Sequence, residues 1–150
     1  MTKEERMSVM DWKKETKSEF EVYPAGTYHV RIVSWERLTA TTGTKQIRWK
    51  AEIIVPDQFK GKSLLDHTAL TENSLWRICR AINALGVDTS ECPKMETDGS
   101  AFDAILNSCK ERKVFWQVTQ ETYNGTLRNK VADYQPDPDQ ETIEPQAPVW

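Results

Sequence analysis

Apolar and polar residues alternate along two early stretches of this chain, which is the pattern of half-buried β-strands. Residues 27–37 and 45–55 each show this period of two, and a small polar, glycine-bearing loop at 39–44 separates them. The sequence therefore predicts two neighbouring strands, each with one face in a core. The apolar positions are Tyr28, Val30 and Ile32 in the first strand and Ile47, Trp49, Ala51, Ile53 and Val55 in the second.

The periodicity changes after a third predicted strand at 62–70. Apolar residues then recur at helical spacing, which predicts a helix over about 74–85. Asn73 or Ser74 is expected to cap its beginning, and Gly86 stands where a helix-ending glycine belongs. A shorter helix is predicted over about 100–108.

Two further alternating stretches, 114–122 and 126–134, flank Asn124-Gly125. Asn-Gly between two such runs is a strong signal for a β-hairpin. The predicted order is three strands, one or two helices and a two-stranded hairpin. We therefore expect a mainly β protein, a five-stranded OB-fold-like barrel with a helix between strands 3 and 4. An α+β sandwich would give a similar string of elements.

The pattern also divides the chain into three parts. Residues 1–19 are expected to form a charged flexible arm, residues 20–134 the OB-fold-like nucleic-acid-binding domain, and residues 135–150 a disordered acidic tail that ends in Trp150. The tail is rich in proline and acidic residues and has too little apolar surface to fold by itself.

Composition adds the class of protein and its expected compartment. The 150 residues are 38% hydrophobic and 29% charged, and no apolar run approaches the roughly 20 residues of a membrane span. The charged start lacks the apolar segment of a secretory signal. Three widely spaced cysteines do not suggest a disulfide framework, so we expect a cytoplasmic protein (the host cytoplasm, if phage-encoded).

Net charge gives no support for a polyanion site until the tail is set aside. The formal charge is −3, from 20 basic and 23 acidic residues. Four of the acidic residues lie in the tail, so the rest of the chain has 20 basic and 19 acidic residues. Any site for nucleic acid must therefore come from local clustering of cations.

Catalytic and metal-binding patterns are absent from the sequence. It has two histidines, no glycine-rich phosphate loop and no close cysteine pair of the kind that holds zinc. Asp66 and His67 are adjacent, but neighbouring strand residues point to opposite faces. We expect no enzyme activity, no cofactor and no metal.

Cations and one tryptophan appear on the predicted polar faces. Single-stranded nucleic acid requires this combination, because cations contact the phosphates and a flat ring stacks on an unpaired base. Polar strand faces are commonly basic in proteins that bind nothing, so each cation alone has an ordinary explanation. Trp49, Trp76 and Trp116 lie on apolar faces and are expected in the core. The predicted nucleic-acid-binding residues are Arg31, Trp35, Arg37, Lys45, Arg48, Lys50, Tyr123, Arg128 and Lys130.

The acidic tail suggests two uses. It could compete with nucleic acid for the cations, and its aromatic end could dock in a pocket of a partner protein. The predicted partner-binding residues are Asp137, Asp139, Glu141, Glu144 and Trp150.

Several segments resemble phage-encoded single-stranded DNA-binding proteins of replication and recombination. They are residues 24–28, the strand with Gly43-Thr44-Lys45, the helical stretch 75–87 and the hairpin stretch 123–131. The resemblance covers residues 20–134 and implies an OB-type fold that binds without sequence preference. The layout of the tail is similar to that of single-strand binders that recruit replication and repair enzymes, although those tails often end in Phe.

The leading hypothesis is thus a protein that coats single-stranded DNA, with Trp35 and Tyr123 stacking on bases, and with replication or recombination proteins as partners of the tail. The sequence does not determine whether it forms a homo-oligomer. The alternative is an adaptor or inhibitor that binds a protein through Trp12 and Trp150. A nuclease is the third hypothesis, and it lacks a carboxylate cluster.

Overall fold

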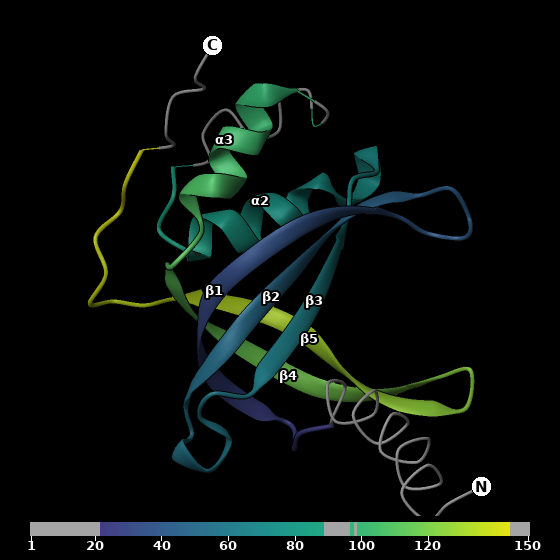
Figure 1. Cartoon of the computed structure of the whole chain (residues 1–150), viewed down its shortest axis with the longest axis vertical. Coiled ribbons are helices and arrows are strands. Elements are labelled where there is room, and N and C mark those ends of the chain that lie inside the picture. Colours follow the sequence, from purple (N-terminus) through teal and green to yellow (C-terminus); the bar gives the residue numbers. More distant parts are fainter. Residues whose placement is uncertain (1–21, 89–96, 98, 145–150) are drawn as a thin grey trace, which may run out of the picture.

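The computed structural model describes residues 22–88, 97 and 99–144 (Figure 1). The strands and helices predicted for this part of the chain are all present. They are β1 (Gly26–Thr39), β2 (Lys45–Val55), β3 (Ser63–Ala69), α2 (Leu75–Ala84), α3 (Ser100–Ser108), β4 (Lys113–Tyr123) and β5 (Thr126–Pro136). Short 3-10 turns, η1 (Asp57–Phe59) and η2 (Glu72–Ser74), follow β2 and β3.

The five strands form one antiparallel sheet in the order β3-β2-β1-β4-β5. The long strand β1 pairs with β2 on one side and with β4 on the other. In the described residues β3 and β5 are the two edges and do not pair with each other. The predicted mainly β, five-stranded architecture is confirmed, but the strands do not close into a barrel, and the sheet remains open between β3 and β5.

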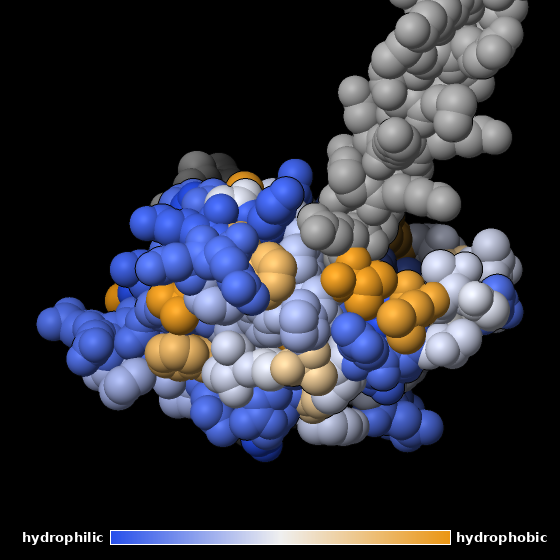
Figure 2. All heavy atoms as spheres, turned by 90° about the horizontal axis from the view of Figure 1, so that it is seen from below, coloured by the Kyte–Doolittle hydropathy of each residue, from blue (hydrophilic) through white to orange (hydrophobic). Residues whose placement is uncertain are grey.

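The inward face of the sheet and both helices enclose the core. Trp49 and Trp116 are buried there at 1% and 2% exposure, as predicted. Helices α2 and α3 cover one end of the curved sheet (Figure 1). Seen from the opposite end, the coloured surface is mainly hydrophilic, with separate smaller hydrophobic areas (Figure 2).

Two predicted turns have the expected backbone. Asn124 and Gly125 both have positive φ, 51° and 78°, as the tight β4–β5 hairpin requires. Gly86 ends α2 at φ 79°, and the amide of the following Val87 donates to the carbonyl of Ile82. Ser74 is the N-cap residue of α2, as predicted, but its side chain makes no capping hydrogen bond, and the η2 turn leads directly into the helix.

The region predicted as a disordered tail is in part attached to the domain. β5 continues to Pro136, and Ile143 forms a parallel bridge with Val87, shortly after the end of α2. The side chain of Gln140 donates to the carbonyls of Leu85 and Lys113 at 3.1 and 2.8 Å. Residues 137–144 thus lie along the domain; Trp150 and the arm 1–19 are outside the described residues.

The cysteines differ from the sequence expectation. Cys109 is free and buried. Cys79 on α2 is disulfide-bonded, and its partner is outside the described residues. No helix in the described part of the chain is long and apolar enough to cross a membrane.

Candidate nucleic-acid interface

The outer face of β2 and β3, the side turned away from the core, has cations in register. Arg48 and Lys50 alternate with the buried residues of β2, so their side chains project outward. Arg48 lies directly opposite His67 of β3, and Lys50 lies opposite Leu65. Paired positions on antiparallel strands place side chains on the same face. Arg48 and His67 are therefore neighbours on the outer face.

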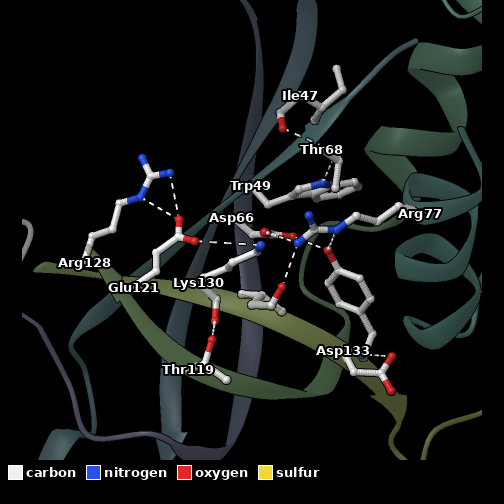
Figure 3. A network of polar contacts seen from close by, with 12 residues as sticks. Ile47, Trp49, Asp66, Thr68, Arg77, Thr119, Glu121, Arg128, Lys130 and Asp133 are labelled. Carbon is white, nitrogen blue, oxygen red and sulfur yellow. Dashed lines mark hydrogen bonds and ion pairs between the residues drawn. The ribbon is translucent and has the colours of Figure 1, made fainter. Parts of the chain in front are cut away.

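The β4–β5 hairpin brings two more cations towards this face. Arg128 donates through Nε to Glu121 at 2.8 Å, and the ammonium of Lys130 lies 3.8 Å from the same carboxylate (Figure 3). The β1–β2 and β4–β5 loops extend on the same side of the molecule, with edge strand β3 between them (Figure 1). We call Arg48, Lys50, His67, Arg128 and Lys130 together the basic face.

The electrostatics at His67 indicate how close these cations are. Partial burial lowers the pKa of His67, and the charges of Arg48 and Arg128 lower it further. Arg48 comes from the neighbouring strand, whereas Arg128 acts from β5 across the open side of the sheet. Residues from strands far apart in the chain therefore act on one imidazole ring.

Carboxylates accompany the arginines of the basic face. Arg48 forms an ion pair with Glu36 of β1. In the hairpin, Glu121 forms ion pairs with both Arg128 and Lys130. These pairs are at least partly exposed, and exposed ion pairs contribute only about 0–1 kcal/mol to stability. A phosphate group could therefore take the place of such a carboxylate at small cost.

Behind the basic face, a buried polar network joins the two edge strands (Figure 3). Arg77 of α2 donates to Asp66 of β3 at 3.3 Å and to the carbonyl of Val131 of β5 at 2.7 Å. Its Nε also donates to the hydroxyl of Tyr134 at 3.2 Å, and that hydroxyl donates to Asp66. The described strands β3 and β5 do not pair through their backbones, so these side chains provide the connection between them.

Asp66 in this network is 4% exposed. Burial raises its pKa to about 6, although the hydrogen bond from Tyr134 and the charge of Arg77 oppose the rise. Burial also raises the pKa of Tyr134. Every buried side-chain nitrogen and oxygen atom in the described residues has a hydrogen-bond partner. The network is thus satisfied internally and is structural.

A β-bulge turns two predicted residues of β1, Trp35 and Arg37, away from the basic face. The register of β1 with β2 shifts between Ile32 and Ser34, so alternation restarts and Trp35 lies opposite the buried Trp49. Trp35 is packed against the core, and its indole donates to Asn107 of α3 at 3.1 Å. Trp35 is therefore partly buried, whereas the sequence pattern predicted it to be exposed.

The same bulge separates the arginines of β1. Arg37 lies opposite the buried Ile47 and donates to Asp103 of α3 at 2.5 Å. Arg31, before the bulge, lies on the outer face and pairs with Glu52 at 3.1 Å and with Glu111. Arg31, Trp35 and Arg37 therefore do not share a face as predicted, and Arg37 fastens α3 to the sheet.

The remaining predicted binding residues lie near the loops. Lys45 is the first residue of β2 and is exposed, and its carbonyl accepts from the amide of Leu70, the residue after β3. Tyr123 is the last residue of β4, and its side chain is outside the described part of the structure.

Trp76 is a surface aromatic that the sequence prediction placed in the core. It is 66% exposed on the first turn of α2. Arg77, the next residue, reaches the gap between β3 and β5, and Arg80, one turn later, pairs with Asp133 of β5 at 2.8 Å. Residues four apart share a helix face. Trp76 and Arg80 therefore lie on the same side of α2. The spacing of four residues between Trp76 and the charged Arg80 could have predicted that Trp76 is exposed.

The predicted partner-binding residues of the tail have separate environments. Asp137 is buried, and its carboxylate contacts His29 at 2.8 Å. A hydrogen bond from the amide of Asp139 and the contact with His29 lower the pKa of Asp137. Asp137 is thus part of the domain and is not a recruiting residue. Asp139, Glu141 and Glu144 remain exposed.

The described residues hold no group of three or more histidine, cysteine, aspartate or glutamate side chains arranged to bind a metal ion.

The family comparison covers nearly the whole chain. A family model described as "Protein of unknown function (DUF669)" matches residues 10–145, so the chain belongs to that family. No curated protein matches it. A solved structure described as yeast RPA bound to ssDNA is similar over 77% of this chain and 78% of that chain. The sequence identity is 16% and the TM-score 0.35, a likeness too low to carry an argument.

Proposed function

We propose that this member of the DUF669 family binds single-stranded DNA, without sequence preference, along its basic face. One observation carries the proposal. Cations from β2 and from the β4–β5 hairpin gather around His67 on an outer face that two projecting loops flank. A flexible polyanion fits such a surface because its phosphates can follow cations that come from several strands.

The strand order supports the same proposal. The sheet has the element order expected of an OB-fold, opened between β3 and β5. In that fold the face of strands 2 and 3, with the loops that join strands 1–2 and 4–5, binds oligonucleotides. The basic face of this chain occupies the corresponding surface.

Trp76 is the proposed stacking residue in place of Trp35. A base stacks on an aromatic ring only where the ring is accessible, and Trp76 is 66% exposed, whereas Trp35 is partly buried and its indole donates to Asn107 of α3. Trp76 also lies on the side of α2 that carries Arg80, and Arg80 pairs with Asp133 of β5. Unpaired bases are available in single strands and are stacked inside a duplex.

The biological role extends this proposal. The resemblance to phage-encoded single-stranded DNA-binding proteins supports a role in coating DNA during phage replication or recombination, in the host cytoplasm. The exposed acidic residues Asp139, Glu141 and Glu144 are the proposed contacts for replication or recombination proteins. We propose no enzyme activity.

The direct test is a titration of a fluorescently labelled oligo(dT) with the full chain, followed by anisotropy at several salt concentrations. We expect binding that weakens as salt rises, and much weaker binding of a duplex of equal length. The double variant R48Q/K50Q removes two cations of the basic face. It should lower the slope of log K against log salt by about 0.7 for each phosphate that these cations neutralise.

K110Q is the matched control, because Lys110 is exposed in the turn between α3 and β4, on the other side of the molecule from β3 (Figure 1). It removes one positive charge far from the basic face and should change affinity little. Equal effects of K110Q and R48Q/K50Q, or binding of oligo(dT) that does not depend on salt, would contradict the proposal.

The second candidate function is protein binding. An exposed tryptophan also suits a docking surface, and Trp76 is such a residue. In that case the W76A variant would lose a protein partner, while the full chain would show no affinity for oligo(dT) at low salt.

A further inference from the structure

His67 lies at the centre of the basic face and differs from its neighbours in being able to change charge near neutral pH. It is exposed on the outer face of edge strand β3, directly opposite Arg48. The four cations around it are permanently charged at neutral pH. A bound phosphate at this place would face an imidazole that can be neutral or positive.

The charged groups around His67 come from four strands. From β2 come Arg48 and Lys50, and Glu36 of β1 is paired with Arg48. From β5 come Arg128 and Lys130, whose carboxylate partner is Glu121 of β4. On β3 itself the nearest titratable neighbour is Asp66, which points to the opposite, inner face. Cations thus outnumber carboxylates around the ring.

We propose that His67 is a phosphate-binding residue whose protonation is coupled to the binding of single-stranded DNA. This inference rests on the proposed function. It adds one phosphate-contacting residue and the protonation that is coupled to DNA binding. In the free protein, partial burial and the charges of Arg48 and Arg128 lower the pKa of His67, which favours the neutral ring. A phosphate beside the ring supplies the negative charge that favours the protonated form.

Linkage makes the effect reciprocal. If DNA raises the pKa of His67, then protonation of His67 must strengthen DNA binding by the same factor. A rise of one pKa unit corresponds to an affinity about tenfold higher at low pH than at high pH. Affinity should therefore increase as the pH falls from about 8 to 5.5, and proton uptake should reach about half a proton for each protein bound at its maximum.

Asp66 also titrates in this range, because its pKa is about 6. Its protonation removes a negative charge behind the basic face and would also favour DNA at low pH. A pH profile of the unmodified protein alone would therefore not isolate His67. The variant H67Q retains Asp66 and removes only the imidazole, so the difference between the two profiles reports on His67.

The first measurement is an NMR titration of the histidine ring protons of the full chain with and without oligo(dT). The chain has two histidines. His29 stacks on Phe115 with ring centroids 4.4 Å apart and contacts Asp137, so its signal is the internal reference. We expect the titration midpoint of His67 to rise by about one unit on binding, and the His29 signal to be unaffected.

The second measurement is the affinity of H67Q and of the unmodified protein for oligo(dT) between pH 5.5 and 8. H67Q should lose most of the gain at low pH and match the unmodified protein at pH 8. If oligo(dT) binds but the His67 midpoint and the H67Q profile do not differ from their controls, the inference about His67 is wrong and the proposed function stands. If oligo(dT) does not bind at all, the proposed function is wrong, and the inference about His67 is wrong with it.

Discussion

The gap between β3 and β5 has two sides with opposite properties. On the inner side Arg77 is fixed by three acceptors, Asp66, Tyr134 and the Val131 carbonyl; Asp66 is buried and the Arg77 side chain is 26% exposed. On the outer side Arg128 is about half exposed and pairs with a partly exposed carboxylate, Glu121. Two arginines at one gap thus have different roles. The inner one replaces missing backbone pairing, and the outer one is available to an anion.

The sharpest way to test this comparison is to remove each arginine. R77A leaves Asp66 buried without its cation, and breaking a buried pair destabilises proteins by about 3–5 kcal/mol. R128A removes an exposed pair, so it should cost at most about 1 kcal/mol. Urea denaturation followed by circular dichroism measures both. Similar losses for the two variants would show that the inner network is not the connection between the strands.

The inner network also predicts how stability depends on pH. Asp66 has its pKa raised from 3.8 to about 6, so the folded state holds its proton more tightly than the unfolded state. The stability from this group is fully present below pH 3.8 and is lost as the pH rises through 6. Denaturation midpoints between pH 4 and 7 should fall with rising pH. D66N should flatten this part of the profile, and an unchanged profile would contradict the assignment.

Residues 137–144 give a third prediction. Deletion of 137–150 removes the Asp137–His29 contact, the Gln140 hydrogen bonds and the Ile143 bridge. Because the net contribution of one hydrogen bond to stability is about 1 kcal/mol, we expect the free energy of unfolding to fall by roughly 1–3 kcal/mol. A chain that ends at residue 144 keeps these contacts and is the control. A tail that acts only by competing with DNA would instead leave stability unchanged and tighten oligo(dT) binding when deleted.

The smallest expected change in stability comes from Trp76. W76A should leave the denaturation midpoint nearly unchanged, since the ring is 66% exposed. It should weaken oligo(dT) binding by about 1–3 kcal/mol if one base stacks on the ring. W35F is the matched variant, and it should retain DNA affinity because Trp35 packs below α3. A drop in affinity in W35F rather than in W76A would restore Trp35 as the stacking residue.

Local pattern alone determined the elements of the fold. The alternation in 45–55 predicted β2 with its true bounds, and Asn124-Gly125 predicted the β4–β5 hairpin. Helical spacing and Gly86 predicted α2 to within about one residue at each end. These features depend only on residues a few positions apart in the sequence, so the local sequence is sufficient to predict them.

Tertiary structure decided which faces meet and which side chains stay exposed. One bulge after Ile32 reversed the alternation of β1 and left Trp35 partly buried against the core, although a strict period of two places it with Arg31. Trp76 is exposed because no element packs over its side of α2 in the described structure. Arg77, which no pattern marked, became the link between β3 and β5. The periodicity of apolar residues specifies the two faces of a helix or strand. Which face is exposed to water depends on the elements, distant in the sequence, that pack against it.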